Sequence, residues 1–134
     1  MPTITIRDQA TTGGTTGELT IDILSEELTV RELIRARVYQ EVQDFNLRQL
    51  KDAAAPFRGL VQPTDAEVTL NGFRLKTPRQ LDWKPQFEKA CDAFEASRVL
   101  VLIDDHQAAS LDERVMLRPT TEVTFLRLTP LVGG

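Results

Sequence analysis

Alternating apolar and polar residues predict β-strands near both ends of the chain. Residues 3–7 and 19–24 place apolar side chains at every second position, and the Gly-rich residues 11–17 lie between them. These segments predict a hairpin with a flexible loop and one buried face. Residues 122–128 alternate in the same way, whereas residues 99–103 are a continuous apolar run, short enough for a buried central strand.

A helical period of apolar residues follows the predicted hairpin. Thr29 and Glu32 have the spacing of a capping box, in which each side chain bonds to the other residue's backbone N–H. The apolar positions that recur at helical spacing are Val30, Leu33, Ile34, Val38 and Val42. The charged residues assigned to the other, solvated face are Arg31, Glu32, Arg35, Arg37 and Glu41. The pattern predicts an amphipathic helix over residues 29–44.

Residues 45–98 form an additional section between the helix and the strand at 99–103. Residues 45–55 are expected to extend the helix or form a second one, with Pro56 as its stop. An Asn-Gly pair at the centre of residues 68–75 predicts a hairpin. Residues 85–98 predict a helix that Pro85 opens. The section has too much aromatic surface to be a linker, from Phe57, Phe73, Trp83, Phe87 and Phe94.

The order of these elements predicts an α+β fold, in which a helix packs on one face of a mixed sheet. Residues 114–118 are expected to add a short edge strand. By length the chain is one domain over residues 1–134, with residues 45–98 as an insertion within it and residues 129–134 as a flexible C-terminal tail.

Composition argues against two classes of partner. The net charge is −4 and the pI is near 5.0, and no basic run is present to bind nucleic acid. The longest apolar run, residues 99–103, is too short to span a membrane, and no secretory signal is visible at the N-terminus. The single cysteine, Cys91, excludes an internal disulfide. We expect a cytoplasmic protein.

The last residues predict the chemistry. Thr129 is biased to extended geometry and Pro130 should end the last strand ladder. Leu131 and Val132 are apolar residues on a free tail, where a partner could bury them. Gly133 and Gly134 have no Cβ, so they can thread a narrow channel and present the carboxylate of Gly134 as a reactive group.

These segments resemble those of β-grasp carrier proteins. The run Leu28-Thr29-Val30-Arg31-Glu32-Leu33 resembles the start of the helix in that family. The run Glu122-Val123-Thr124-Phe125-Leu126, followed by a Pro-containing tail and Gly133-Gly134, is similar to the endings of ubiquitin, of the molybdopterin-synthase small subunit and of the thiamine-pathway sulfur carrier. The resemblance covers residues 1–44 and 99–134. The insertion is absent from the small sulfur carriers and from ubiquitin, and the tail is longer than that of the molybdopterin subunit.

The resemblance implies a β-grasp fold and a thioester, amide or thiocarboxylate at Gly134. The first hypothesis is a ubiquitin-like modifier, which a ubiquitin-activating-like adenylating enzyme activates with ATP and a conjugating enzyme passes to target proteins. A JAMM-type metalloprotease would remove it, and such a set in a bacterium would resemble the conjugation systems of antiphage defence. The second hypothesis is a sulfur carrier for molybdopterin, thiamine or tRNA sulfuration. The third is an interaction module without tail chemistry.

The protein itself is not expected to be an enzyme or to bind a cofactor, since it has no Gly-rich phosphate loop and no Ser in a nucleophile-elbow context. Cys91 is expected in the core rather than as a nucleophile. Asp104, Asp105 and His106 are expected to face solvent, because no second His or Cys pair completes a metal site. Leu126 and Leu128 should lie on the face of the last strand that the helix does not cover. They are either a partner-docking patch or a surface that the insertion covers.

Overall fold

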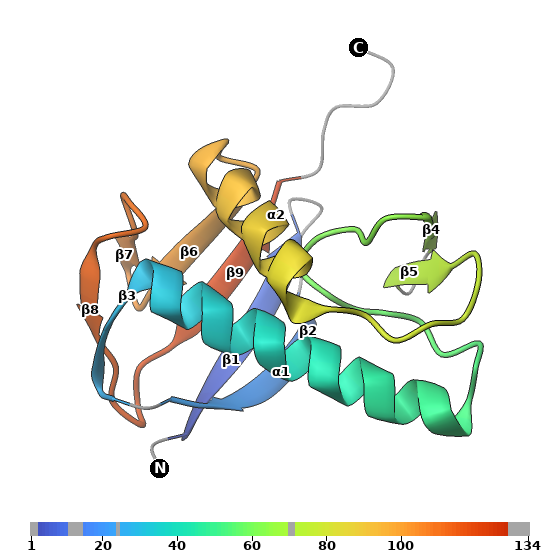
Figure 1. Ribbon diagram of the computed structural model, residues 1–134. Helices are drawn as coiled ribbons and strands as arrows, with labels where there is room; N and C mark the ends of the chain where they lie inside the picture. Colours follow the sequence, from blue (N-terminus) through green and yellow to red (C-terminus); the bar gives the residue numbers. More distant parts are fainter. Residues whose placement is uncertain (1–2, 11–14, 24, 70–71, 129–134) are drawn as a thin grey trace.

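The computed structural model describes residues 3–10, 15–23, 25–69 and 72–128 (Figure 1). The strands are β1 (Thr3–Ala10), β2 (Thr15–Asp22), β3 (Glu27–Thr29), β4 (Ala66–Thr69), β5 (Gly72–Leu75), β6 (Val99–Ile103), β7 (His106–Gln107), β8 (Arg114–Met116) and β9 (Val123–Arg127). The helices are α1 (Val30–Lys51) and α2 (Trp83–Glu95). The predicted α+β class is confirmed.

A mixed five-stranded sheet forms the base of the molecule, in the order β2-β1-β9-β6-β7. The first and last strands, β1 and β9, are adjacent and parallel, with Ile6 opposite Val123, while every other pair in this sheet is antiparallel. Both hairpin strands are longer than predicted: β1 continues to Ala10, and β2 begins at Thr15. The strand predicted over residues 122–128 is present as β9.

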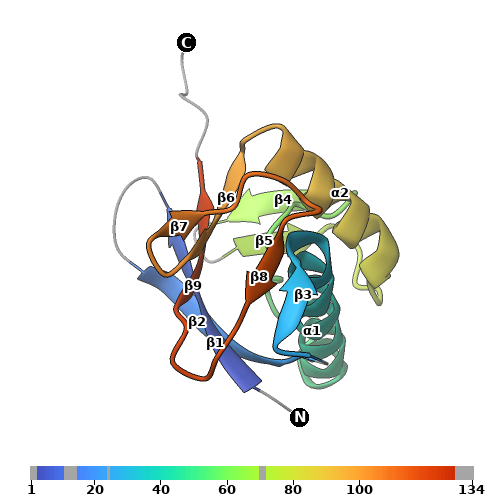
Figure 2. The same cartoon turned by 90° about the vertical axis from the view of Figure 1, so that its left-hand side faces the viewer.

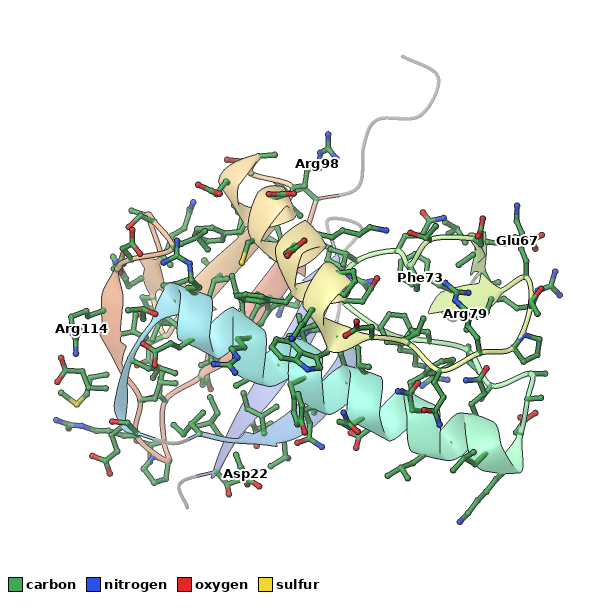
Figure 3. All side chains as sticks on the ribbon, in the orientation of Figure 1. Asp22, Glu67, Phe73, Arg79, Arg98 and Arg114 are labelled. Atoms are coloured by element: carbon green, nitrogen blue, oxygen red, sulfur yellow. The ribbon has the colours of Figure 1, made fainter. Side chains whose placement is uncertain are left out.

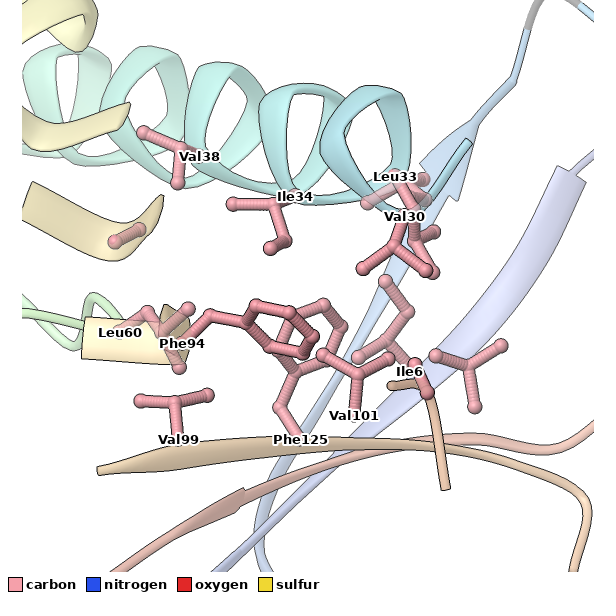
Figure 4. Close-up of a cluster of buried hydrophobic side chains, with 14 of the residues drawn as sticks. Ile6, Val30, Leu33, Ile34, Val38, Leu60, Phe94, Val99, Val101 and Phe125 are labelled. Carbon is pink, nitrogen blue, oxygen red and sulfur yellow. The ribbon is translucent and has the colours of Figure 1, made fainter. Parts of the chain in front are cut away.

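Helix α1 lies across one face of this sheet (Figure 1). The predicted capping box is confirmed, since the Thr29 side chain accepts from the Glu32 backbone and the Glu32 carboxylate accepts from the Thr29 backbone. Figure 4 shows Ile34 and Val38 of α1 directed toward Val101 and Phe125 of the sheet, with Phe94 between the layers. These side chains belong to one buried apolar cluster.

Helix α1 is longer than the predicted 29–44. No Gly or Pro interrupts residues 45–51, and Phe45 is buried on the same side as the earlier apolar positions, so the helix continues until Asp52 adopts an extended backbone. The expectation that residues 45–55 extend the helix is therefore confirmed as far as Lys51.

The section 45–98 packs on the same core as the sheet. The Phe57 ring is fully buried, and its centroid lies 5.2 Å from that of Phe45 on α1. Strands β4 and β5 form the predicted hairpin, and a short bridge between Phe57 and Phe73 joins it to the preceding loop. Helix α2 begins at Trp83, two residues before Pro85, because the Asp82 side chain caps the Lys84 N–H. It ends at Glu95 rather than Arg98.

A separate two-stranded sheet, β3 paired with β8, lies beside α1 (Figure 2). The segment predicted as an edge strand over residues 114–118 therefore pairs outside the main sheet, and β7 occupies the edge next to β6 instead. Backbone bonds from the Val30 and Arg31 N–H groups to the Glu113 and Leu111 carbonyls, both 2.9 Å, hold this small sheet against the start of α1.

Within the described residues, no helix combines the length and the apolar content that a bilayer crossing requires.

Candidate functional site

The predicted tail residues Thr129, Pro130, Leu131, Val132, Gly133 and Gly134 lie outside the described residues. The predictions made for them therefore remain predictions. Leu128 is the last described residue and follows β9 directly. Its N–H donates to the Arg98 carbonyl at 2.8 Å. This bond fixes the end of β9 against the residue that precedes β6, so the site to consider is the surface around these two residues.

A groove of about 590 Å³ opens at the end of β9. Three parts of the fold line it: the loop and strand that carry Leu60 and Phe73, the second half of α2, and the adjoining ends of β6 and β9. Figure 3 shows Arg98 beside the end of β9, with Phe73 on β5. The section 45–98 therefore supplies one wall of the groove, and the main sheet supplies the other.

Three cations and one carboxylate surround this groove. The Lys89 ammonium donates to the Thr64 hydroxyl at 3.1 Å and to the Gln62 carbonyl at 3.3 Å, both neutral oxygens. Over the described residues, Lys89, Arg98 and Arg127 form no ion pair. The Nε of Arg127 is buried and has no hydrogen-bond partner. The groove therefore has unmatched positive charge and an unmet donor.

The two docking candidates occupy different surroundings. Leu128 is half-buried and lines the groove beside residues of the section 45–98. Leu126 does not line it and lies directly opposite Leu100 in the β6–β9 register. Val123 and Phe125 are buried while Leu126 is half-buried, so Leu126 projects from the face of the sheet away from α1.

A buried ionic cluster joins α1 to the sheet, and it corrects one prediction. Arg37 and Glu41 were assigned to the solvated face, but Arg37 is 1% exposed and Glu41 is 8% exposed. Arg37 follows Leu33 by four residues, which is about one turn at 3.6 residues per turn, so its side chain lies on the same face of the helix as the apolar residues. The sequence did contain this signal, because positions 30, 34, 37, 38 and 41 share a face.

The contacts of this cluster satisfy most of its buried atoms. Arg37 donates through both terminal nitrogens to the Asp8 carboxylate, with Nη2 at 2.7 Å from Oδ2, and through Nε to Glu41 at 3.1 Å. The Leu60 N–H donates to the other Glu41 oxygen at 3.1 Å. The guanidinium carbon lies 4.6 Å from the centroid of the Phe125 ring. The cluster therefore links β1, α1, β9 and the section 45–98.

The electrostatics of the cluster favour a structural role. Burial raises the pKa of Glu41, opposed by the attraction of Arg37. Burial alone would lower the pKa of Arg37, but the carboxylates of Glu41 and Asp8 outweigh it and raise that pKa. Arg37 therefore stays charged at every pH at which the fold exists, and it is not placed to exchange protons with a substrate.

Cys91 and residues 104–106 do not line the groove at the end of β9. Cys91 packs against the core, and burial raises the pKa of its thiol, so its thiolate is disfavoured at neutral pH. Asp104, Asp105 and His106 are exposed. The Asp104 carboxylate accepts from the Glu122 N–H at 2.9 Å, which joins the turn after β6 to the residue before β9. Throughout the described part of the chain, no group of His, Cys, Asp and Glu side chains is arranged to hold a metal ion.

A second groove, of about 430 Å³, lies between α1 and the end of β2. Its aromatic residues are Trp83 and Tyr39, whose ring centroids are 5.8 Å apart, and Tyr39 is 49% exposed. The Arg35 guanidinium lies 5.2 Å from the centroid of the Trp83 ring. This groove lies away from the end of β9.

No protein-family model, curated protein or solved structure matches the chain.

Proposed function

We propose that the protein is a ubiquitin-like modifier with a β-grasp fold, whose Gly134 carboxylate is activated and joined to target proteins. One observation carries the proposal: β9 pairs in parallel with β1 inside the sheet and leads directly toward the residues that include Gly133 and Gly134. A strand fixed on both sides gives the residues after it a rigid point of departure. The proposal requires Gly134 to carry a free α-carboxylate.

The arrangement of elements supports the β-grasp assignment. A hairpin of β1 and β2 is followed by α1 across one face of the sheet, and the first and last strands of that sheet are parallel neighbours. These are the features that the resemblance in residues 28–33 and 122–126 implied. The section 45–98 then elaborates the fold between α1 and β6.

The proposed chemistry proceeds in four steps: adenylation of the carboxylate, formation of a thioester, transfer of that thioester to a second cysteine and formation of an amide. An oxygen of the Gly134 carboxylate attacks the α-phosphorus of ATP in a separate adenylating enzyme, pyrophosphate leaves, and a mixed anhydride with AMP forms. A cysteine thiolate of that enzyme attacks the carbonyl carbon, and AMP leaves as the thioester forms. After transfer to a conjugating enzyme, a target amine attacks the thioester, the thiolate leaves, and an amide remains once the nitrogen has lost a proton.

The section 45–98 favours a modifier over the sulfur carrier. A sulfur carrier inserts its end deep into a synthase, and α2 together with the loop around Leu60 adds bulk beside the end of β9. A modifier is recognised from the outside by activating, conjugating and JAMM-type deconjugating proteins, for which additional surface provides selectivity. Leu126 and Leu128 are retained as docking residues in this proposal.

The interaction-module alternative rests on the groove at Trp83 and Tyr39, which needs no tail chemistry. Intact mass spectrometry of the protein from its native host separates the three functions. Gly134 in isopeptide linkage to lysines supports the modifier. A mass gain that corresponds to replacement of one oxygen by sulfur supports the sulfur carrier. A chain that continues past Gly134, or that carries neither change, would favour the function of an interaction module.

Substitution tests the step itself. Gly133→Val should abolish ATP-dependent adduct formation with a candidate adenylating enzyme, because a branched side chain would clash with the walls of a channel that admits glycine. A chain ending at Val132 should also form no adduct. Leu131→Ala is the matched control and should retain the adduct at a reduced rate. An equally good adduct from the chain ending at Val132 would remove the diglycine from the mechanism.

A further inference from the structure

We propose that the groove at the end of β9 docks an acidic segment of a partner protein. The inference rests on the proposed function, in which that partner is the activating enzyme, and it identifies the surface and the chemistry by which the partner is held. The groove residues that carry it are Lys89, Arg98, Arg127, Phe73 and Leu128.

The charges of the groove point to a ligand rich in carboxylates. The whole chain has a net charge of −4, yet Lys89, Arg98 and Arg127 face only Asp92 around this groove. Elsewhere on the described surface, Arg7, Arg31, Arg74 and Arg114 each pair with a carboxylate of this chain, whereas Arg48, Lys84 and Arg118 form no ion pair, so the groove is distinguished by the gathering of three such cations around one carboxylate. Cations without such a partner attract a negatively charged ligand and steer its approach. Added salt screens this attraction and so weakens it.

The uncharged lining gives the same ligand an apolar anchor. Leu60 and Val99 are buried beneath the groove, and Phe73 and Leu128 are partly buried at its sides. The buried Nε of Arg127 lacks an acceptor, and a buried donor without a partner is costly. The best occupant is therefore a peptide that combines acidic and apolar side chains.

The position of the groove connects it to the reactive end. Leu128 lines the groove and is bonded to Arg98 by its backbone N–H. The six residues 129–134 that follow extend at most about 20 Å when fully stretched. A partner segment held in the groove would therefore lie within that reach of Gly134. Because Lys89 and Phe73 come from the section 45–98, such a partner would recognise the insertion and the end of β9 together.

A synthetic peptide of alternating glutamate and leucine serves as the probe, with glutamine replacing glutamate in its neutral counterpart. Titrated into the isotopically labelled full chain, the acidic peptide should shift the amide resonances of Lys89, Asp92, Val99 and Leu128, and binding should weaken as salt is added. Arg98→Glu and Lys89→Glu should each weaken binding at least about fivefold, because each replaces attraction of the peptide glutamates by repulsion.

Two charge reversals outside the groove are the matched controls. Lys84→Glu lies on α2 but outside the groove, and Arg118→Glu is an exposed arginine elsewhere, so both should bind as the parent does. Thermal unfolding of all four variants checks that the fold is intact, and Arg98 is exposed, so Arg98→Glu should unfold as the parent does. Equal binding of the glutamine peptide, or unchanged binding by Arg98→Glu, would overturn the inference.

The groove's other possible occupant is the end of this chain. If deleting residues 129–134 shifts the groove resonances while the acidic peptide shifts none, the groove belongs to the chain's own end and the proposal is wrong. The adduct assay keeps the two proposals separate. An adduct that forms with unchanged KM in Arg98→Glu refutes the docking inference alone. Peptide binding without any adduct at Gly134 preserves the acid-binding groove and refutes the modifier function.

Discussion

Replacement of Arg37 by methionine should strongly destabilise the protein. The guanidinium is almost fully buried between α1 and the sheet, where it is the cation opposite both Asp8 and Glu41. Methionine fills most of the same volume but carries no charge and no donors. The substitution therefore leaves two carboxylates in a buried site without their guanidinium, and it removes the cation from the face of Phe125.

The magnitude follows from that imbalance. Removing one member of a buried ion pair typically costs about 3–5 kcal/mol, because the charge left behind keeps its desolvation penalty and loses its attraction. The Phe125 contact contributes up to about 2 kcal/mol more when desolvated. A domain of this size is stable by about 5–15 kcal/mol, so Arg37→Met should remove roughly a third or more of its stability.

Urea unfolding followed by circular dichroism and by the fluorescence of Trp83 measures this loss. Arg48→Met, at an exposed position of α1 with no ion pair among the described residues, is the control and should change stability by less than about 0.5 kcal/mol. The double variant Arg37→Met/Glu41→Gln should recover at least about 1 kcal/mol, because one buried charge is gone and glutamine can still accept from the Leu60 N–H. A loss below about 1 kcal/mol for Arg37→Met, or a double variant less stable than the single one, would refute the reasoning.

Three further predictions test other parts of the fold. Gly72→Ala should lower the free energy of unfolding in urea by about 1–3 kcal/mol, because Gly72 has φ +131 and an added Cβ would lie 2.4 Å from the Phe57 carbonyl oxygen. Gly17→Ala is the control and should be tolerated, because no atom lies within 4 Å of an added Cβ there. Glu113→Gln should make the free energy of unfolding depend less on pH in acid. The hydrogen bond from the Ala109 N–H, and then the one with His106, lower the pKa of Glu113 below its usual 4.5. The stabilisation from Glu113 is therefore present above that pH and is lost as pH falls through the pKa of the folded state. Native-state hydrogen exchange should show slow amides in residues 57–98, and Phe57→Ala should accelerate them while costing about 3–5 kcal/mol; uniformly fast exchange across this section in the parent chain would contradict its packing on the core.

The main sheet was predictable because one of its faces is buried. Ile4, Ile6, Val123 and Phe125 all face α1 and all are buried, so a period of two residues was visible along β1 and β9. The continuous run at Val99–Ile103 indicated a buried central strand, but β6 is second from the edge of the sheet and Leu100 and Leu102 are only half-buried. Strands β3 and β7 have three and two residues, which is too short for any period to register. Their pairing depends on partners distant in the chain.

The sequence left open whether residues 45–55 extend α1 or form a second helix, because distant residues hold its last turns. The Asn46 side chain exchanges hydrogen bonds with the Leu81 backbone at 2.9 and 3.0 Å, and Gln49 likewise exchanges hydrogen bonds with the Arg79 backbone. These amides bind the last turns of α1 to the loop before α2. The same reasoning explains Arg37 and Glu41, whose charge masked their place on the apolar stripe.

The groove at the end of β9 was also beyond sequence reasoning, since its walls come from three separated stretches of chain. Leu60 shows why it is nevertheless a fixed part of the fold. Its backbone N–H bonds to Glu41 inside the ionic cluster, while its side chain is buried beneath the groove. The wall of the groove is therefore attached to the centre of the molecule through Glu41 and Arg37. It follows that weakening this cluster should loosen the groove before it unfolds the sheet, so Arg37→Met should also reduce binding of the acidic peptide. If the peptide binds Arg37→Met as tightly as the parent under conditions where both are folded, the groove does not depend on the cluster.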